Sequence, residues 1–248
     1  MPIKKIIAFD FDDTLAHTVS TIGVRRLLSD GSADSEFEDF LLDNNIQYIR
    51  KDRGFWWLDS ANFALFEDLP VPSRAEDEID YSETASIDME LSKGIGSMLS
   101  KLAEAQADPE SIALVVTARA GEKAMFSPAK GSNVAPQNRE QIIQFLNDNG
   151  IGISSDQLHT VGDMDGETPQ GKASVLSGYL DKHQPEELIF YDDSERNVKA
   201  VAQLCKQYSP NVKISAYMVA NGNATSPEIC KEGIKHRLHE ILMSVLWG

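Results

Sequence analysis

The stretch KKIIAFDFDDTLAHT, residues 4–18, decides the fold class. A short apolar run, residues 6–9, ends directly at three carboxylates, Asp10, Asp12 and Asp13. Because its apolar residues do not recur at three- or four-residue spacing, the run predicts a buried strand of a parallel sheet rather than a helix. The carboxylates then lie at the carboxyl end of the strand, the edge where open α/β sheets bind ligands. Asp10 and Asp12 point to the same side of an extended backbone, and such crowding favours a bound cation.

Size and charge bound the possible functions. The 248 residues suit one large domain, or a core with a modest insertion. Twenty-three basic and thirty-nine acidic residues give a net charge of −16, which disfavours nonspecific attraction to nucleic acid or to an anionic membrane. The apolar run before Asp10 is too short for a signal peptide, and no run approaches a membrane span. We therefore expect a soluble, cytoplasmic protein without a membrane partner, and its oligomeric state stays open.

Strand and helix patterns alternate after residue 88. Strands are predicted at 112–116, 157–163, 187–193 and 213–219, and helices at 89–106, 139–149, 170–183 and 194–207. Gly150 stands where the second of these helices would stop. The alternation is typical of an α/β protein with a Rossmann-like parallel sheet and helices on both faces. A last amphipathic helix is predicted after a start signal in residues 225–228, with apolar residues at Ile234, Leu238, Ile241, Leu242 and Val245.

Residues 16–88 do not follow this alternation. We interpret them as an inserted cap or lid, which leaves residues 1–15 and 89–248 as the core. Phe55, Trp56 and Trp57 are expected to form the small core of the cap, and a platform that stacks on substrate is the alternative. Residues 74–90 hold seven acidic residues and one arginine, so we expect a solvated acidic loop there.

Four motifs together resemble the haloacid dehalogenase superfamily of aspartate-dependent phosphohydrolases. Its Asp-x-Asp-x-Thr motif corresponds to residues 10–14, which include Thr14, and its strand-ending Thr or Ser corresponds to Thr117 in ALVVTAR. Its lysine near a helix corresponds to Lys172 in PQGKASVL, and its acidic pair corresponds to Asp192 and Asp193 in LIFYDDS. Asp13 stands where many members carry glycine. The resemblance covers about residues 3–16 and 89–220 and implies that superfamily's α/β core.

The resemblance and the chemistry of phosphate esters assign roles to these residues. A phosphomonoester is a dianion, so an anionic nucleophile needs a divalent cation, and Mg²⁺ suits an all-oxygen site. Asp10, Asp192, Asp193 and the main-chain carbonyl of Asp12 are the expected metal ligands. Asp10 would attack phosphorus to give an aspartyl phosphate, and the Asp12 side chain would act as general acid and base. Thr117 and Lys172 would stabilise the phosphoryl group.

Simpler interpretations compete with these roles. Asp10 and Asp12 could belong to a solvated turn, and Thr117 could only cap the turn after its strand. Lys130 and Lys182 are rivals of Lys172 for the motif lysine. Asp193 or Ser194 could serve as the N-cap of the following helix.

The substrate is the least determined part of the prediction. Thr14 and the long segment after Thr117, with Arg119 and Lys123, are the candidate substrate-binding residues. The motif spacing is loosely similar to the phosphatase domains of phage-type polynucleotide kinase 3'-phosphatases, which makes a nucleic-acid end an alternative substrate. The net charge of −16 favours a small phosphorylated compound instead. A non-catalytic module that senses phosphate or binds a protein is the alternative from another functional class.

Overall fold

The computed structural model describes residues 2–69, 77–165, 167–209 and 211–228. Contacts divide the chain into two compact units, the first with residues 1–17, 93–119 and 142–248 and the second with residues 18–92 and 120–141. Residues 120–141 were expected in the core, as part of residues 89–248. They group instead with the second unit, where the hydroxyl of Ser127 donates a hydrogen bond of 3.1 Å to buried Asp80.

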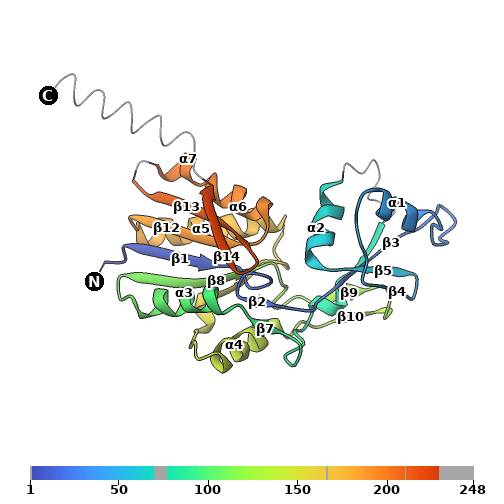
Figure 1. The fold of residues 1–248 in the computed structure, drawn as a ribbon, viewed down its shortest axis with the longest axis horizontal. Helices are drawn as coiled ribbons and strands as arrows, with labels where there is room; N and C mark the ends of the chain where they lie inside the picture. The colour runs from blue at the N-terminus through green and yellow to red at the C-terminus, as the bar shows by residue number, and fades with distance from the viewer. Residues whose placement is uncertain (1, 70–76, 166, 210, 229–248) are drawn as a thin grey trace, which may run out of the picture. The chain divides into compact units, whose positions relative to one another are not determined.

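The first unit contains a six-stranded sheet in the order β11-β8-β1-β12-β13-β14 (Figure 1). Its strands are β1 (Lys5–Phe9), β8 (Ser111–Thr117), β11 (Leu158–Thr160), β12 (Glu187–Asp192), β13 (Lys213–Ala220) and β14 (Asn223–Glu228). All neighbours are parallel except the last pair, β13 and β14. The central strand β1 pairs Ile6 with Ile112 on one side and with Leu188 on the other. The sequence prediction of an α/β protein with a mainly parallel sheet is confirmed.

Helices cover both faces of this sheet. They are α3 (Gly96–Ala107), α4 (Asn138–Asp148), α5 (Thr168–His183), α6 (Glu195–Ala202) and the short α7 (Cys205–Tyr208). Leu176 of α5 and Val198 of α6 share one buried cluster with Ile6, because alternate strand residues point to the same face. On the opposite face, α3 packs along β1 and β8, and Ala105 lies near Ile7. Gly150 has a φ of +79° two residues after α4, the conformation expected at a helix stop.

Three predicted helix boundaries differ from the structure. The helix predicted over 89–106 begins at Gly96, because Lys93–Gly94 pairs as β7 with Ala16–His17, which is β2. The helix predicted over 194–207 is divided into α6 and α7. Residues 225–228, predicted to start the last helix, belong to β14, and the rest of that helix lies outside the described residues. Within the described residues, no helix is both long and apolar enough to cross a membrane.

The second unit is built on an antiparallel sheet in the order β4-β5-β3-β6. Its strands are β3 (Ile22–Arg26), β4 (Arg50–Asp52), β5 (Phe55–Leu58) and β6 (Asp77–Asp80), and its helices are α1 (Phe37–Asp43) and α2 (Ser60–Asp68). A two-stranded hairpin, β9 (Met125–Ser127) and β10 (Ser132–Val134), belongs to the same unit. Helix α2 begins where the Asp59 side chain accepts a 2.7 Å hydrogen bond from the Asn62 amide, an N-cap.

Part of the predicted acidic loop is a strand. Residues 77–80 form β6 and pair with β3, and Asp80 is fully buried. Arg25 and Arg26 of β3 form ion pairs with Glu78 and Asp77 opposite them, so the carboxylates are neutralised by a neighbouring strand rather than by solvent. Residues 74–76 lie outside the described part of the chain.

The aromatic run of the second unit is buried, and its side chains are divided between the two faces of the sheet. Trp56 packs in a cluster with Val24, Phe37 and Phe66 between the sheet and helices α1 and α2. Phe55 and Trp57 alternate with Trp56 along β5 and therefore point to the other face of the sheet. There the guanidinium of Arg25 lies 4.4 Å from the Phe55 ring centre, and all three aromatic side chains are at most 3% exposed.

Candidate active site

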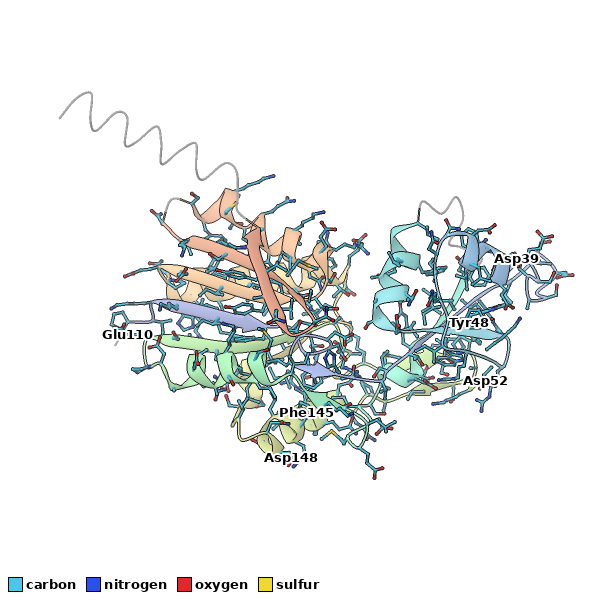
Figure 2. The ribbon with its side chains drawn as sticks, in the orientation of Figure 1. Asp39, Tyr48, Asp52, Glu110, Phe145 and Asp148 are labelled. Atoms are coloured by element: carbon cyan, nitrogen blue, oxygen red, sulfur yellow. The ribbon has the colours of Figure 1, made fainter. Side chains whose placement is uncertain are left out.

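The loop after β1 is a tight turn that fixes the first aspartates. The Asp10 amide donates a 2.8 Å hydrogen bond to the carbonyl of Tyr191 in the adjacent strand, so Asp10 continues the sheet. The amides of Leu15 and Ala16 both donate to the carbonyl of Phe11, at 2.9 and 3.0 Å. The Phe11 ring packs edge-on against Phe145 of α4, labelled in Figure 2. The turn therefore holds Asp10 at the carboxyl end of the central strand.

Lys172 links the two acidic strand ends. It lies in the second turn of α5, is fully buried, and its Nζ donates to Oδ1 of Asp10 at 2.6 Å and to Oδ2 of Asp192 at 2.7 Å. Asp10 follows β1 and Asp192 ends β12, which are neighbouring parallel strands. The structure brings these three residues together, and their chemical roles stay predictions.

Asp192 is held by donors on the following helix. Its Oδ1 accepts 2.8 Å from the amide of Ser194, the N-cap of α6, and 3.0 Å from the side-chain amide of Asn197. Asp193 was considered as an N-cap, but Ser194 occupies that position and Asp192 receives its amide hydrogen bond. The Asp193 carboxylate lies instead with those of Asp10 and Asp192, and one oxygen of each falls within 4.8 Å of the others.

The cluster carries more negative than positive charge. Burial, more than the opposing attraction of Lys172, raises the pKa of Asp10 well above its usual range, and Asp192 and Asp193 raise it further. Burial and the charge of Asp192 raise the pKa of Asp193 to about 7. Burial alone would lower the pKa of Lys172, but the carboxylates of Asp10 and Asp192 raise it, so Lys172 stays charged. Three converging carboxylates with one ammonium form an oxygen-donor set that fits Mg²⁺.

Arg119 and Asp12 form the second charged group of the site. The Nε of Arg119 donates to Asp12 Oδ2 at 2.9 Å and its Nη2 donates to Oδ1 at 2.7 Å, a bidentate pair. Arg119 was predicted to bind substrate, whereas its buried guanidinium here binds the carboxylate predicted to be the general acid. Thr117 ends β8, and its buried hydroxyl accepts a 3.3 Å hydrogen bond from the Arg119 amide, as a strand-end turn requires.

The other two predicted substrate-binding residues differ in their surroundings. Thr14 is fully buried, and its hydroxyl has no hydrogen-bond partner among the described residues. Lys123 is exposed and belongs to the second unit, whereas the other predicted site residues belong to the first.

The sequence analysis did not identify Asn197 or the Arg119–Asp12 pair. Asn197 is 6% exposed, and its side-chain amide donates to both oxygens of Asp192. The segment DDSERN contained a usable signal, because an asparagine in the first turn of a helix, one turn after a strand-end aspartate, can reach back to it. No local pattern connects Arg119 with Asp12, which are 107 residues apart in the sequence.

Comparisons with known proteins add little. No protein-family model matches the chain. No curated protein matches it. Among solved structures, the HAD domain of the effector protein Lem4 from Legionella pneumophila is 13% identical over 98% of this chain and 95% of its own, with a TM-score of 0.38. An inactive mutant of that domain is 13% identical over 97% and 94%, with a TM-score of 0.33.

A UDP-N-acetylglucosamine 2-epimerase is another structural match, at 14% identity and a TM-score of 0.31. The match covers 52% of this chain and 32% of the epimerase, so the chain spans about a third of that protein.

Proposed function

We propose that this protein is a Mg²⁺-dependent phosphomonoester hydrolase of the haloacid dehalogenase type, acting through an aspartyl phosphate on Asp10. The observation that carries the proposal is the buried bridge from Asp10 through Lys172 to Asp192, with Asp193 beside it. A lone buried salt bridge needs no third carboxylate, and the surplus negative charge is costly unless a cation is bound. Buried groups whose pKa values are shifted by such a surplus of negative charge are typical of functional sites.

The reaction uses the two aspartates of the first loop in succession. An oxygen of Asp10 attacks phosphorus and forms a P–O bond, while the ester P–O bond breaks and the leaving oxygen takes a proton from Asp12. Asp12 then accepts a proton from the water that attacks the aspartyl phosphate, which releases inorganic phosphate and restores the Asp10 carboxylate and the protonated Asp12. Bound Mg²⁺ would neutralise charge on the nucleophile and the phosphoryl oxygens, held by Asp10, Asp192, Asp193 and the Asp12 carbonyl. Lys172 orients Asp10 through its 2.6 Å hydrogen bond, and its charge opposes the rise in the pKa of Asp10 that burial causes.

Arg119 is a positioning residue in this proposal. Its bidentate hydrogen bonds fix the plane of the Asp12 carboxylate. Because the Arg119 side chain is buried, water has little access to its guanidinium and does not compete for these bonds. An Arg-to-Lys change at this position would retain the charge and lose the bidentate geometry. Its effect should therefore appear in turnover more than in substrate affinity.

The substrate we propose is a small phosphorylated compound. Polynucleotide backbones are bound by cations free to contact phosphates. Four basic side chains of the second unit already pair with carboxylates of the same unit: Arg25 with Glu78, Arg26 with Asp77, Arg50 with Glu83 and Lys51 with Glu38. These pairs and the net charge of −16 support a small ester over a nucleic-acid end.

The test compares Asp10→Asn with Asp13→Asn. Asp13 is in the same loop, its Oδ1 lies 3.2 Å from Nδ1 of His17, and its φ of 52° suits asparagine, so Asp13→Asn is a matched control. With p-nitrophenyl phosphate and Mg²⁺, we expect wild type and Asp13→Asn to turn over, and Asp10→Asn or added EDTA to abolish turnover. Equal rates in all four samples would sink the proposal.

A second assay addresses the substrate class. Phosphorylated metabolites and oligonucleotides with 3'- or 5'-phosphates are compared at two salt concentrations. We expect a metabolite to be preferred, with little effect of salt, since few phosphate contacts are made. Preference for an oligonucleotide end with a steep loss at high salt would instead support the polynucleotide phosphatase alternative.

A further inference from the structure

The carboxyl edge of the core sheet carries a surplus of negative charge in the first unit. The turns after the parallel strands β1, β8, β11 and β12 meet at this edge, because the strands end there together. In the described residues of these turns there are eight carboxylates, whereas Arg119 is the one basic residue and Lys172 reaches in from α5. Five carboxylates belong to the β1 and β12 turns described above. The other three follow β11: Asp163, Asp165 and Glu167.

The turn after β11 adjoins the residues predicted to bind the phosphoryl group. The amide of Val161 donates a 2.9 Å hydrogen bond to the carbonyl of Thr117, and the amide of Gly162 donates one of 3.2 Å to the carbonyl of Arg119. These two bonds continue the pairing of β11 with β8. The chain then enters α5, whose Lys172 is bonded to the proposed nucleophile. The acidic residues of this turn therefore lie between two elements that build the candidate active site.

The cations at this edge are already bonded to carboxylates. Arg119 holds Asp12, and Lys172 holds the two strand-end aspartates described above. A bound Mg²⁺ ion would add two positive charges, so the carboxylates would still outnumber the positive charges before the phosphate dianion of the substrate arrives. Two cations of the neighbouring helix α6 are paired as well: Arg196 with Glu167 at 3.1 Å and Lys199 with Glu195 at 2.7 Å.

We propose that the substrate is a phosphomonoester that carries an ammonium group, such as the ester of an amino alcohol, and that Asp163 and Asp165 determine this specificity. The inference rests on the proposed function. An ammonium group near the ester is attracted by the surplus carboxylates of the edge. A second phosphate or a carboxylate on the substrate is repelled by them, and it meets Arg119 and Lys172 already bonded to aspartates. The charge of the edge therefore selects among small esters.

Three esters of similar size test the charge preference. Ethanolamine phosphate, 2-hydroxyethyl phosphate and phosphoglycolate carry an ammonium, a hydroxyl and a carboxylate at the same place relative to the ester oxygen. Phosphate release with Mg²⁺ is measured at low and high salt in wild type, Asp163→Asn and Asp165→Asn, with p-nitrophenyl phosphate alongside. Glu186→Gln is the matched control, because it removes one exposed carboxylate just before β12, at the amino edge of the same sheet.

We expect kcat/KM for ethanolamine phosphate to exceed that for 2-hydroxyethyl phosphate by about tenfold or more, with phosphoglycolate the poorest substrate. The preference should shrink at high salt. Asp163→Asn and Asp165→Asn should each reduce it without changing turnover of the neutral ester, and Glu186→Gln should retain it. Equal kcat/KM for the three esters, a preference for phosphoglycolate, or a preference that both Asn variants retain overturns this inference while phosphatase activity stands. Turnover of no ester, p-nitrophenyl phosphate included, contradicts the proposed function itself.

Discussion

The two units of the protein treat charge in opposite ways. In the first unit, Lys172 is buried with the carboxylates of Asp10 and Asp192, and Asp193 converges on the same point. In the second unit, four basic side chains each pair with one carboxylate near the surface, as Arg25 does with Glu78. The buried cluster has one ammonium for three carboxylates, whereas each surface pair has one cation for one carboxylate.

The environment of the cations differs as well. In the second unit the Arg25 guanidinium lies over the Phe55 ring and that of Arg50 lies 4.6 Å from the Trp57 ring centre, so aromatic faces share in holding them. Lys172 has carboxylates on two sides and no water-exposed surface. Balanced exposed pairs contribute little to stability, whereas an unbalanced buried group is retained for chemistry at a cost in stability. The following predictions measure this difference.

The largest effect is expected for Lys172→Met. Removing the ammonium leaves buried carboxylates without a partner, so the free energy of unfolding should fall by about 3–5 kcal/mol without metal. Mg²⁺ should restore part of the loss, and phosphatase turnover should vanish. Urea denaturation with and without Mg²⁺ measures both effects. A loss below ~1 kcal/mol would mean that the cluster is no less balanced than the surface pairs.

Mg²⁺ itself should stabilise the wild-type protein. A ligand that binds only the folded state contributes about 2.7 kcal/mol at a hundred times its dissociation constant. Thermal unfolding at rising Mg²⁺ should therefore show an increasing midpoint in wild type and in Asp13→Asn, and a much smaller increase in Asp193→Asn. An equal shift in all three proteins would place the cation elsewhere.

A smaller loss is expected for Asn197→Ala. The side-chain amide of Asn197 donates to both oxygens of buried Asp192, and an unsatisfied buried acceptor costs about 1–3 kcal/mol. Gln203→Ala, at an exposed position after the same helix, is the control and should leave the unfolding midpoint unchanged. Calorimetric titration should also show weaker Mg²⁺ binding in Asn197→Ala alone. Unaltered stability and affinity would contradict a supporting role for Asn197.

The smallest effect is expected in the second unit. Glu78→Gln breaks the pair with Arg25, whose side chains are 25% and 34% exposed, so the cost should stay below about 1 kcal/mol and should shrink with added salt. Denaturant unfolding at low and high salt checks this. A loss as large as that of Lys172→Met would break the comparison between the two units.

The fold class could be predicted from the sequence because strand ends and helix faces are local patterns. The apolar run before Asp10 and the LIFYDD run both became neighbouring parallel strands, which brought Asp10 and Asp192 together. Strand β6 was missed because the partners of its carboxylates, Arg25 and Arg26, come about fifty residues earlier in the chain. Pairing over such distances depends on packing, which no local window contains.

For the candidate site, too, local motifs could be predicted from the sequence and long-range contacts could not. Lys172 was identified by its motif, but its two short hydrogen bonds, and the pairing of Arg119 with Asp12, depend on how strands from distant parts of the chain are ordered. The start of α3 was missed for a related reason, because Lys93–Gly94 pairs with β2 and thereby cannot belong to the helix. Long-range pairing decides these details.

The central place of β1 in the sheet has a consequence for synthesis on the ribosome. Residues 5–9 leave the ribosome before both partner strands, β8 and β12, which come more than a hundred residues later in the chain. At roughly 5–20 residues per second, β1 precedes β12 by on the order of 9–36 s. Until β8 emerges, both edges of this apolar strand are unpaired in the nascent chain, and the edge that pairs with β12 stays unpaired for the whole interval. Chaperone binding to the exposed strand β1, followed by release once residue 192 has emerged, is the expected course of folding in the cell.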